Sequence, residues 1–182
     1  GFESLRPSIM DKKLKIFSGR SNPVLAEKIA NSLGQDLGAL AIKTFSDGEL
    51  WIKFEENIRG TDVFIIQPTN SPGDNIIELV LTIDAAVRAS ANTVTAVIPY
   101  FGYARADRKT AGRESITAKL TANILVKSGV DRVLAMDLHS AQIQGYFDIP
   151  CDHIYGSPVL VDYLSTKELD EIVVVSPDVG GV

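Results

Sequence analysis

The feature that most constrains the fold is a regular alternation between short apolar runs and longer helix-like segments. The runs are rich in β-branched residues, which is typical of strands buried on both faces of a sheet. They occupy residues 14–17, 39–45, 50–54, 63–67, 93–98, 132–136 and 172–175. Helical patterns lie at about 22–34, 74–91 and 115–129. The alternation predicts an α/β fold with a mostly parallel sheet flanked by helices.

Two of these segments carry clear local signals. Asn22 followed by Pro23 is typical of a helix start, because asparagine caps the helix and proline suits its first turn. Asp47 and Gly48 form a turn signal between two neighbouring apolar runs. Residues 39–54 are therefore predicted to form an antiparallel hairpin attached to the main sheet.

Composition limits the class of protein. A net charge of -5 argues against a nucleic-acid-binding surface, which is usually basic. No apolar run approaches the roughly 18 to 20 residues of a membrane span. The single cysteine, Cys151, excludes an intrachain disulfide and favours a reducing, cytoplasmic location. We expect neither nucleic acid nor a membrane among the partners of this protein.

The two ends of the chain lead to predictions about domain organisation. Residues 1–10 lack the basic start and apolar centre of a signal peptide, and we interpret them as an artificial extension. Residues 11–182 are then one N-terminal α/β domain. A glycine-rich turn after 172–175 indicates the truncated start of a second domain, with the rest of that domain absent.

Cations gather in the stretch "VIPYFGYARADRKTAGRESITAKL", residues 97–120, although the chain as a whole is acidic. A guanidinium group presents a planar fork of donors that matches phosphate oxygens, so a strand-end loop with several such groups suits a polyphosphate. A solvated loop with scattered charge is the alternative, and the residues alone leave it open. The cations are Arg105, Arg108, Lys109, Arg113 and Lys119.

Further polar residues follow other predicted strands. Ligands of open α/β sheets bind beyond the carboxyl ends of the strands, so these residues are expected at one edge. His139 could ligate a metal, act as acid or base, or cap the next helix. Asp178 could bind Mg²⁺ or a ribose hydroxyl, or simply form a turn. The residues expected at this edge are Arg105, Asp107, Arg108, Lys109, Asp137, His139 and Asp178.

The hairpin turn and the second histidine are less informative. Asp47 and Glu49 could accept hydrogen bonds from the amino group of a base or from another subunit, or could serve only to keep the turn soluble. Phe45 could stack on a flat ring, although aromatic residues in strands more often belong to the core. Cys151 and His153 are interpreted as structural, because no partner motif accompanies them.

Several long motifs together resemble one known family. They are "FSDGE" (45–49), "NIRGTDVFIIQ" (57–67), "VIPYFGYARADRK" (97–109), "SITAKL" (115–120), "GVDRVLAMDLHSAQIQGYFDIP" (129–150) and "VVVSPDVGG" (173–181). In order and spacing, they resemble the ribose-phosphate pyrophosphokinase family, also called phosphoribosyl pyrophosphate synthetases. The resemblance runs from about residue 14 to the end of the chain.

The resemblance implies a phosphoribosyltransferase-type fold, with two domains in each subunit. It implies transfer of the diphosphoryl group of ATP to the 1-hydroxyl of ribose 5-phosphate, with Mg²⁺, to give phosphoribosyl pyrophosphate and AMP. Diphosphoryl transfer depends on positioning the reactants and on neutralising the charge of the phosphates. The resemblance also implies dimers assembled into hexamers, and regulation by phosphate and ADP at a subunit interface.

Site residues are carried over from the resemblance by position. The loop 105–114 would close over ATP. ATP-binding positions would be Phe45, Asp47, Gly48, Glu49, Arg105, Asp107 and Arg108, with Phe45, Asp47 and Glu49 contacting adenine from an adjacent subunit. Metal-associated positions would be His139 and Asp178. Regulatory positions would be Asn57, Arg59, Gln144 and Asp152.

The chain departs from the family pattern in two respects. Ala106 stands where the family usually has glutamine, so one nucleotide contact is lost or replaced. The family's second half, with a catalytic lysine and the ribose 5-phosphate loop, would lie beyond Val182. We therefore expect residues 1–182 alone to be inactive. Alternatives are a non-catalytic regulatory relative, another nucleotide-binding α/β domain and a salvage phosphoribosyltransferase.

Overall fold

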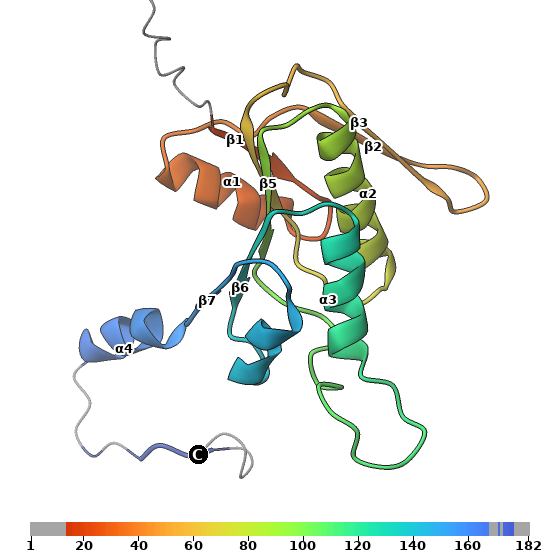
Figure 1. The fold of residues 1–182 in the computed structure, drawn as a ribbon. Coiled ribbons are helices and arrows are strands. Elements are labelled where there is room, and N and C mark those ends of the chain that lie inside the picture. Colours follow the sequence, from red (N-terminus) through yellow and green to blue (C-terminus); the bar gives the residue numbers. More distant parts are fainter. Residues whose placement is uncertain (1–13, 168–170, 172, 177–182) are drawn as a thin grey trace, which may run out of the picture.

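The main body of the protein is a five-stranded parallel sheet in a computed structural model that describes residues 14–167, 171 and 173–176. The strands lie in the order β1-β4-β5-β6-β7 (Figure 1). Their bounds are β1 Leu14–Ser18, β4 Asp62–Ile66, β5 Thr93–Ile98, β6 Arg132–Met136 and β7 Cys151–Ile154. All four strand pairings are parallel, so the carboxyl ends of the five strands share one edge, as the alternation predicted.

Helices cover the two faces of the sheet unequally. On one face, α2 (Asp74–Arg88) and α3 (Thr117–Lys127) pack against β4, β5 and β6 around the main core, while α1 (Pro23–Ser32) lies on the other face (Figure 1). Strand β5 shows why its sequence reads as a continuous apolar run. Val94, Ala96 and Ile98 are buried on the side of α2 and α3, and Val97 packs on the side of α1.

The helix limits follow local chemistry. Asn22 caps α1 as predicted, since its side-chain oxygen accepts a hydrogen bond from the backbone N–H of Leu25 (3.1 Å). Helix α2 ends at Arg88, three residues before the predicted limit, because Ser90 takes a left-handed backbone conformation with φ of 61°. Within the described residues, no helix combines the length and apolar character needed to cross a bilayer.

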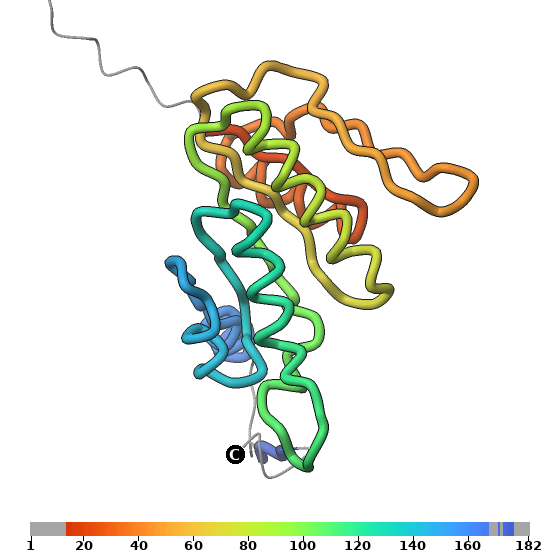
Figure 2. The backbone as a smooth tube through the Cα atoms, turned by 45° about the vertical axis from the view of Figure 1, so that its right-hand side comes forward, coloured from red at the N-terminus to blue at the C-terminus, as the bar shows by residue number. Residues whose placement is uncertain are grey.

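The predicted hairpin forms from β2 (Leu40–Thr44) and β3 (Leu50–Phe54), but it does not join the main sheet. It makes a separate two-stranded sheet whose β3 strand packs against α2, and Phe54 meets Phe17 edge-on at 4.7 Å between ring centroids. Neither hairpin strand pairs with the main sheet, and the hairpin is attached by side-chain packing and by an isolated parallel bridge between Ile16 of β1 and Leu37, just before β2. Its tip extends away from the body (Figure 2).

The C-terminal part of the chain differs most from the prediction. The structure contains a short 3₁₀ helix η1 (Ala141–Tyr146), strand β7 and helix α4 (Ser157–Ser165), none of which was predicted. The strand predicted at 172–175 is not found, because residues 173–176 belong to neither sheet and Val174 is 91% exposed. A strand needs a hydrogen-bonded neighbour, and these valines have none in the described sheets. Residue 172 and Asp178 lie outside the described residues.

Candidate functional site

The loops that follow β5 and β6 enclose a cleft of about 500 Å³ at the carboxyl edge of the sheet. This is the edge at which the sequence predicted a ligand site. Arg105, Asp137 and His139 meet in this cleft, together with two tyrosines that sequence reasoning did not single out. The residues that line it are Tyr100, Phe101, Tyr103, Ala104, Arg105, Ala106, Asp137 and His139.

A close approach between two backbones holds the first of these loops. The N–H of Gly102 donates to the side-chain oxygen of Thr69 (2.8 Å), and the N–H of Thr69 donates to the carbonyl of Tyr100 (2.8 Å). A Cβ at Gly102 would lie 1.9 Å from the carbonyl oxygen of Thr69, so only glycine fits here. The loops after β4 and β5 are therefore fixed to each other directly beside the cleft-lining residues Tyr100 and Phe101.

The second loop is held by the edge strand β7. Asp137 has a left-handed backbone with φ of 44°, which is unusual for a residue with a side chain, and its Oδ1 accepts from the N–H of Gly156 (3.1 Å). The Nε2 atom of His153 accepts from the N–H of Leu138 (3.0 Å). His153 thus orients the segment that presents Asp137 and His139 to the cleft.

His139 does not cap the following helix. Ser140 occupies the N-cap position of η1, while His139 is exposed and lines the cleft. Cys151 is half-buried on β7. Desolvation by burial, with a smaller contribution from the negative charge of Asp152, raises the pKa of its thiol to about 11. Cys151 is therefore a neutral thiol near pH 7, unsuited to nucleophilic chemistry.

The loop 105–114 carries four cationic side chains. Arg105, Arg108, Lys109 and Arg113 are all exposed, and none forms an ion pair with any residue in the described part of the chain. A second hollow of about 510 Å³ adjoins the cleft, and Arg105 and Ala106 line both. Neighbouring positive charges without counter-ions favour an anionic ligand.

Lys119 does not belong to this group. It lies on α3, donates to the carbonyl oxygen of Tyr146 (2.7 Å) and approaches Asp148 at 3.9 Å. The sequence grouped it with the loop cations because it is near them in the chain. Helix α3 turns it towards η1 instead, so four rather than five cations remain for a ligand.

Glu114 organises the loop from within. Its carboxylate accepts hydrogen bonds from the N–H groups of Thr110 (2.7 Å) and Ala111 (2.9 Å), and also from the Thr110 hydroxyl. The backbone hydrogen bonds from Ala111 and Thr110 lower the pKa of Glu114 below its ordinary value of 4.5. This carboxylate accepts from backbone donors and forms no ion pair with the neighbouring cations of the described loop.

Asp107 is engaged inside the protein as well. Its Oδ2 atom accepts from the Ser140 hydroxyl (2.7 Å), and its backbone carbonyl accepts from the Tyr146 hydroxyl. These contacts tie the start of the 105–114 loop to the segment after β6. Neither Ser140 nor Tyr146 was singled out from the sequence, because an isolated hydroxyl has no distinctive pattern.

The hairpin turn lies apart from the cleft. Phe45, Asp47, Gly48 and Glu49 are exposed, and the turn's hydrogen bonds are internal, including Glu49 N–H to Asp47 Oδ1 (3.1 Å). Figures 1 and 2 both show the hairpin tip and the 105–114 loop extending from different ends of the molecule. Within one copy of the chain, the structure does not bring these two groups of predicted residues together.

The four predicted regulatory positions also fall into two groups. Asn57 and Arg59 lie between β3 and β4, where Asn57 Oδ1 accepts from the N–H of Arg59 (3.0 Å). Gln144 lies on η1 and Asp152 on β7, where Asp152 pairs with Arg132 at 2.7 Å. The first pair is at the hairpin end of the domain, and the second pair is at the opposite side of the sheet (Figure 1).

The described residues contain no group of three or more acidic, histidine or cysteine side chains that could enclose a metal ion. Asp137 and His139 do line one cleft, and they offer one carboxylate and one imidazole. Mg²⁺ is commonly held by one or two protein ligands while waters and substrate phosphates complete its shell. The donor set therefore fits a metal shared with a phosphate ligand better than a closed structural site.

Comparison with known proteins assigns the family. A profile described as the N-terminal domain of ribose phosphate pyrophosphokinase matches residues 14–129. A ribose-phosphate pyrophosphokinase of Prochlorococcus marinus is 68% identical over 181 residues, which cover 99% of this chain and 55% of that protein. The corresponding protein of Parasynechococcus marenigrum is 70% identical over 181 residues, covering 99% and 54%.

A solved structure agrees with the sequence comparison. The crystal structure of phosphoribosylpyrophosphate synthetase from Mycobacterium smegmatis matches with a TM-score of 0.82 and 40% identity, over 85% of this chain and 52% of that one. The chain thus spans about half the length of the relatives it matches. The chain belongs to the ribose phosphate pyrophosphokinase family, and residues 14–129 correspond to the family's N-terminal domain.

Proposed function

We propose that this chain is the nucleotide-binding half of a ribose-phosphate diphosphokinase. The reaction is transfer of the diphosphoryl group of ATP to the 1-hydroxyl of ribose 5-phosphate, giving 5-phosphoribosyl 1-pyrophosphate and AMP. The observation that carries the proposal is the group of four unmatched cations on the 105–114 loop beside the cleft. Membership of the pyrophosphokinase family supports this choice of anion and reaction.

The loop cations are proposed to bind the polyphosphate of ATP. Arg105 has the central role because it lines both hollows, and Arg108 lines the outer one. Diphosphoryl transfer concentrates negative charge on the reacting group, and fixed cations stabilise that charge while holding the phosphates in line with the attacking hydroxyl. Asp107 is proposed to anchor the start of the loop through its hydrogen bonds with Ser140 and Tyr146.

His139, with Asp178 from beyond the described residues, is proposed to bind Mg²⁺, and Asp137 is suitably placed in the same cleft to assist. The ion would supply charge neutralisation at the β- and γ-phosphate oxygens of ATP. Ala106 has no amide to offer the nucleotide, and the phenol groups of Tyr100 and Tyr103 are proposed to replace it, since both tyrosines line the cleft.

The adenine ring is proposed to bind to the turn Phe45, Asp47, Gly48 and Glu49 of an adjacent subunit. The exposure of this turn, and its position away from the cleft of its own chain, support a contribution from another copy. This arrangement requires a homo-oligomer, for which we propose dimers assembled into a hexamer. Asn57, Arg59, Gln144 and Asp152 are proposed to take part in regulation by phosphate and ADP. The proposed location is the cytoplasm.

The reaction is tested in the full-length protein, because the catalytic lysine and ribose 5-phosphate loop are proposed to lie in the half that the relatives have beyond this chain. AMP should form from ATP only when ribose 5-phosphate and Mg²⁺ are present, and residues 1–182 alone should form none. ADP as the nucleotide product would contradict diphosphoryl transfer. ATP binding without AMP formation would identify a non-catalytic, synthetase-associated regulatory protein instead.

A further inference from the structure

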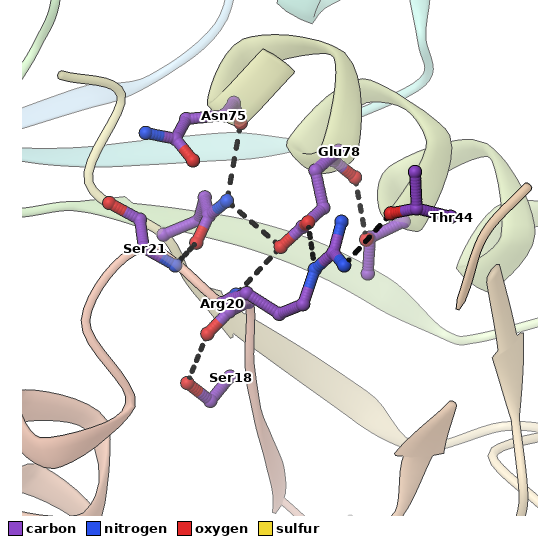
Figure 3. Close-up of polar contacts among 9 residues, drawn as sticks. Ser18, Arg20, Ser21, Thr44, Asn75 and Glu78 are labelled. Carbon is purple, nitrogen blue, oxygen red and sulfur yellow. Dashed lines mark hydrogen bonds and ion pairs between the residues drawn. The ribbon is translucent and has the colours of Figure 1, made fainter. Parts of the chain in front are cut away.

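A buried polar network lies at the carboxyl edge of β1 and β4, away from the cleft. Its centre is Glu78 of α2, which is 3% exposed, beside Gln67, which is fully buried. Figure 3 shows Arg20 between Glu78 and Thr44. The backbone N–H and the Nε atom of Arg20 donate to the two carboxylate oxygens of Glu78, at 2.6 and 2.7 Å.

Gln67 locks the backbone beside Arg20. Its Oε1 accepts from the N–H of Ser21 (3.1 Å), and its Nε2 donates to the Asn75 carbonyl (3.3 Å) and to Glu78 (3.1 Å). A Cβ at Gly19 would lie 2.1 Å from Gln67 Oε1, so the chain passes Gln67 as closely as glycine permits. The loop after β1 therefore has one fixed position relative to α2 and β4.

Arg20 also reaches outward to the hairpin. Its Nη1 atom donates to the hydroxyl of Thr44 (3.1 Å), and Thr44 is the last residue of β2, directly before Phe45. The hydrogen bonds of the following turn are internal to the hairpin. The guanidinium group can donate to Glu78 through Nε and to Thr44 through Nη1 at the same time, because its donors lie in one rigid plane.

We propose that Arg20 is a positioning residue that fixes the Phe45–Glu49 turn for binding the adenine ring of ATP in the neighbouring subunit's site. This inference rests on the proposed function, in which the turn contacts adenine. A turn that is already oriented loses less conformational freedom when the nucleotide binds, so the contact between Arg20 and Thr44 raises affinity without entering the reaction. Glu78 serves as the buried anchor that holds the guanidinium group in place.

The critical variant is Thr44→Val in the full-length protein, because it removes the hydroxyl and leaves the Arg20–Glu78 pair intact. The contact is exposed to water and acts on the nucleotide only through the turn, so its loss predicts an increase of about two- to tenfold in the KM for ATP. The kcat, the KM for ribose 5-phosphate and the midpoint of thermal unfolding should stay unchanged. Thr44→Ser keeps the hydroxyl and should restore the low KM for ATP.

A second variant separates charge from geometry. Arg20→Lys keeps a cation near Glu78, but an ammonium group cannot place two donors in a rigid plane, so the KM for ATP should rise as in Thr44→Val. Combining the two substitutions should add nothing further if they remove the same contact. Arg88→Ala is the matched control: its guanidinium pairs with Asp84 at 2.7 Å on the same helix as Glu78, and the KM for ATP should not change.

Amide hydrogen exchange supplies a readout that does not depend on turnover. The N–H groups of Phe45, Gly48 and Glu49 are hydrogen-bonded within the hairpin, and Thr44→Val should accelerate their exchange severalfold. Unchanged exchange together with an unchanged KM for ATP would overturn the inference. So would an equal rise in the KM for ribose 5-phosphate. Absence of AMP formation by the wild-type protein would refute the proposed function instead, and exchange alone would then decide the role of Arg20.

Discussion

Arginine side chains at two places on the carboxyl edge of the same sheet have opposite surroundings. Arg20, after β1, donates to the buried carboxylate of Glu78, and its surroundings are polar groups that the protein itself supplies. Arg105, after β5, belongs to a group of four exposed cations for which the described residues supply no carboxylate partner. The same residue type thus serves a structural connection at one place and an open site at the other.

The difference teaches that the location of acidic residues, rather than of arginines, separates the two roles. Glu78 is directed into the network from a buried face of α2, where it needs a cation. Glu114 is next to Arg113 in the sequence, but its carboxylate accepts hydrogen bonds from backbone N–H groups of its own loop. The loop thereby gains local order, while its arginine and lysine side chains form no ion pair with the described residues.

The largest effect is expected when the ion pair between Arg20 and Glu78 is removed. Glu78→Ala should lower the free energy of unfolding by about 2–3 kcal/mol, because the buried Gln67 amide loses an acceptor and the half-exposed Arg20 side chain loses its ion-pair partner. Urea unfolding of wild type and variant measures the difference. Glu78→Gln keeps an acceptor oxygen and should cost less. A loss below about 1 kcal/mol for Glu78→Ala would show that the network is not a stabilising anchor.

Substitutions in the 105–114 loop should change the affinity for ATP rather than the free energy of unfolding. Arg105→Ala should weaken ATP binding by about 10- to 100-fold, since a charge-assisted contact to phosphate contributes roughly 1.5–3 kcal/mol. The free energy of unfolding should change by less than about 0.5 kcal/mol, because the side chain has no partner in the described residues. Calorimetric titration with ATP tests this, and an unchanged affinity would remove Arg105 from the site.

A smaller effect is expected from loosening the open loop without changing its cations. Glu114→Gln should increase tryptic cleavage at Arg108, Lys109 and Arg113 severalfold, because the amide is a weaker acceptor for the N–H groups of Thr110 and Ala111. If cleavage rates of wild type and variant are equal, Glu114 does not order the loop.

The same contact predicts a pH dependence. The pKa of Glu114 is lower in the folded protein than its ordinary value of 4.5. The stability that the Glu114 carboxylate gives to the folded loop is therefore complete above about pH 4.5, and it is lost as the pH falls through the lowered pKa. Amide exchange at Thr110 and Ala111, corrected for the intrinsic effect of pH, should therefore lose protection only on strong acidification. Glu114→Gln should abolish this pH dependence.

The smallest effect is expected for an arginine that is paired but exposed. Arg88 and Asp84 form a 2.7 Å ion pair on α2, with side chains 77% and 46% exposed. Water screens such a pair, so Arg88→Ala should leave unfolding and ATP binding within experimental error. A clear loss of stability in urea unfolding would mean that pairing alone, without burial, accounts for the contrast between Arg20 and Arg105.

Sequence patterns predicted the parts of the fold that local chemistry dictates. The apolar runs became β1 to β6, and Asn22 caps α1 as expected. Strand β7 was missed because its residues Cys151–Ile154 alternate between half-buried and exposed at the sheet edge, so the run carries little apolar signal. The predicted strand at 172–175 had that signal, but it finds no pairing strand in the described sheets.

The candidate site was predicted in outline because strand-end loops of a parallel sheet must meet at one edge. This rule located Arg105, Asp137 and His139 together. It could not reveal that Asp107 is bonded to Ser140, or that Lys119 is directed to η1, because each partner is at least 27 residues away in the chain. Arg20 was missed for the same reason, since Glu78 is 58 positions from it.

By itself, the sequence determined the alternation of strands and helices, the turn at Asp47 and Gly48, and the concentration of cations after β5. These depend on residues close together in the chain, through backbone preference and apolar periodicity. Only the tertiary structure decided which charges are matched. Whether an arginine binds a carboxylate of the protein or stays open for a ligand depends on groups brought together from distant segments, and on whether they are buried from water.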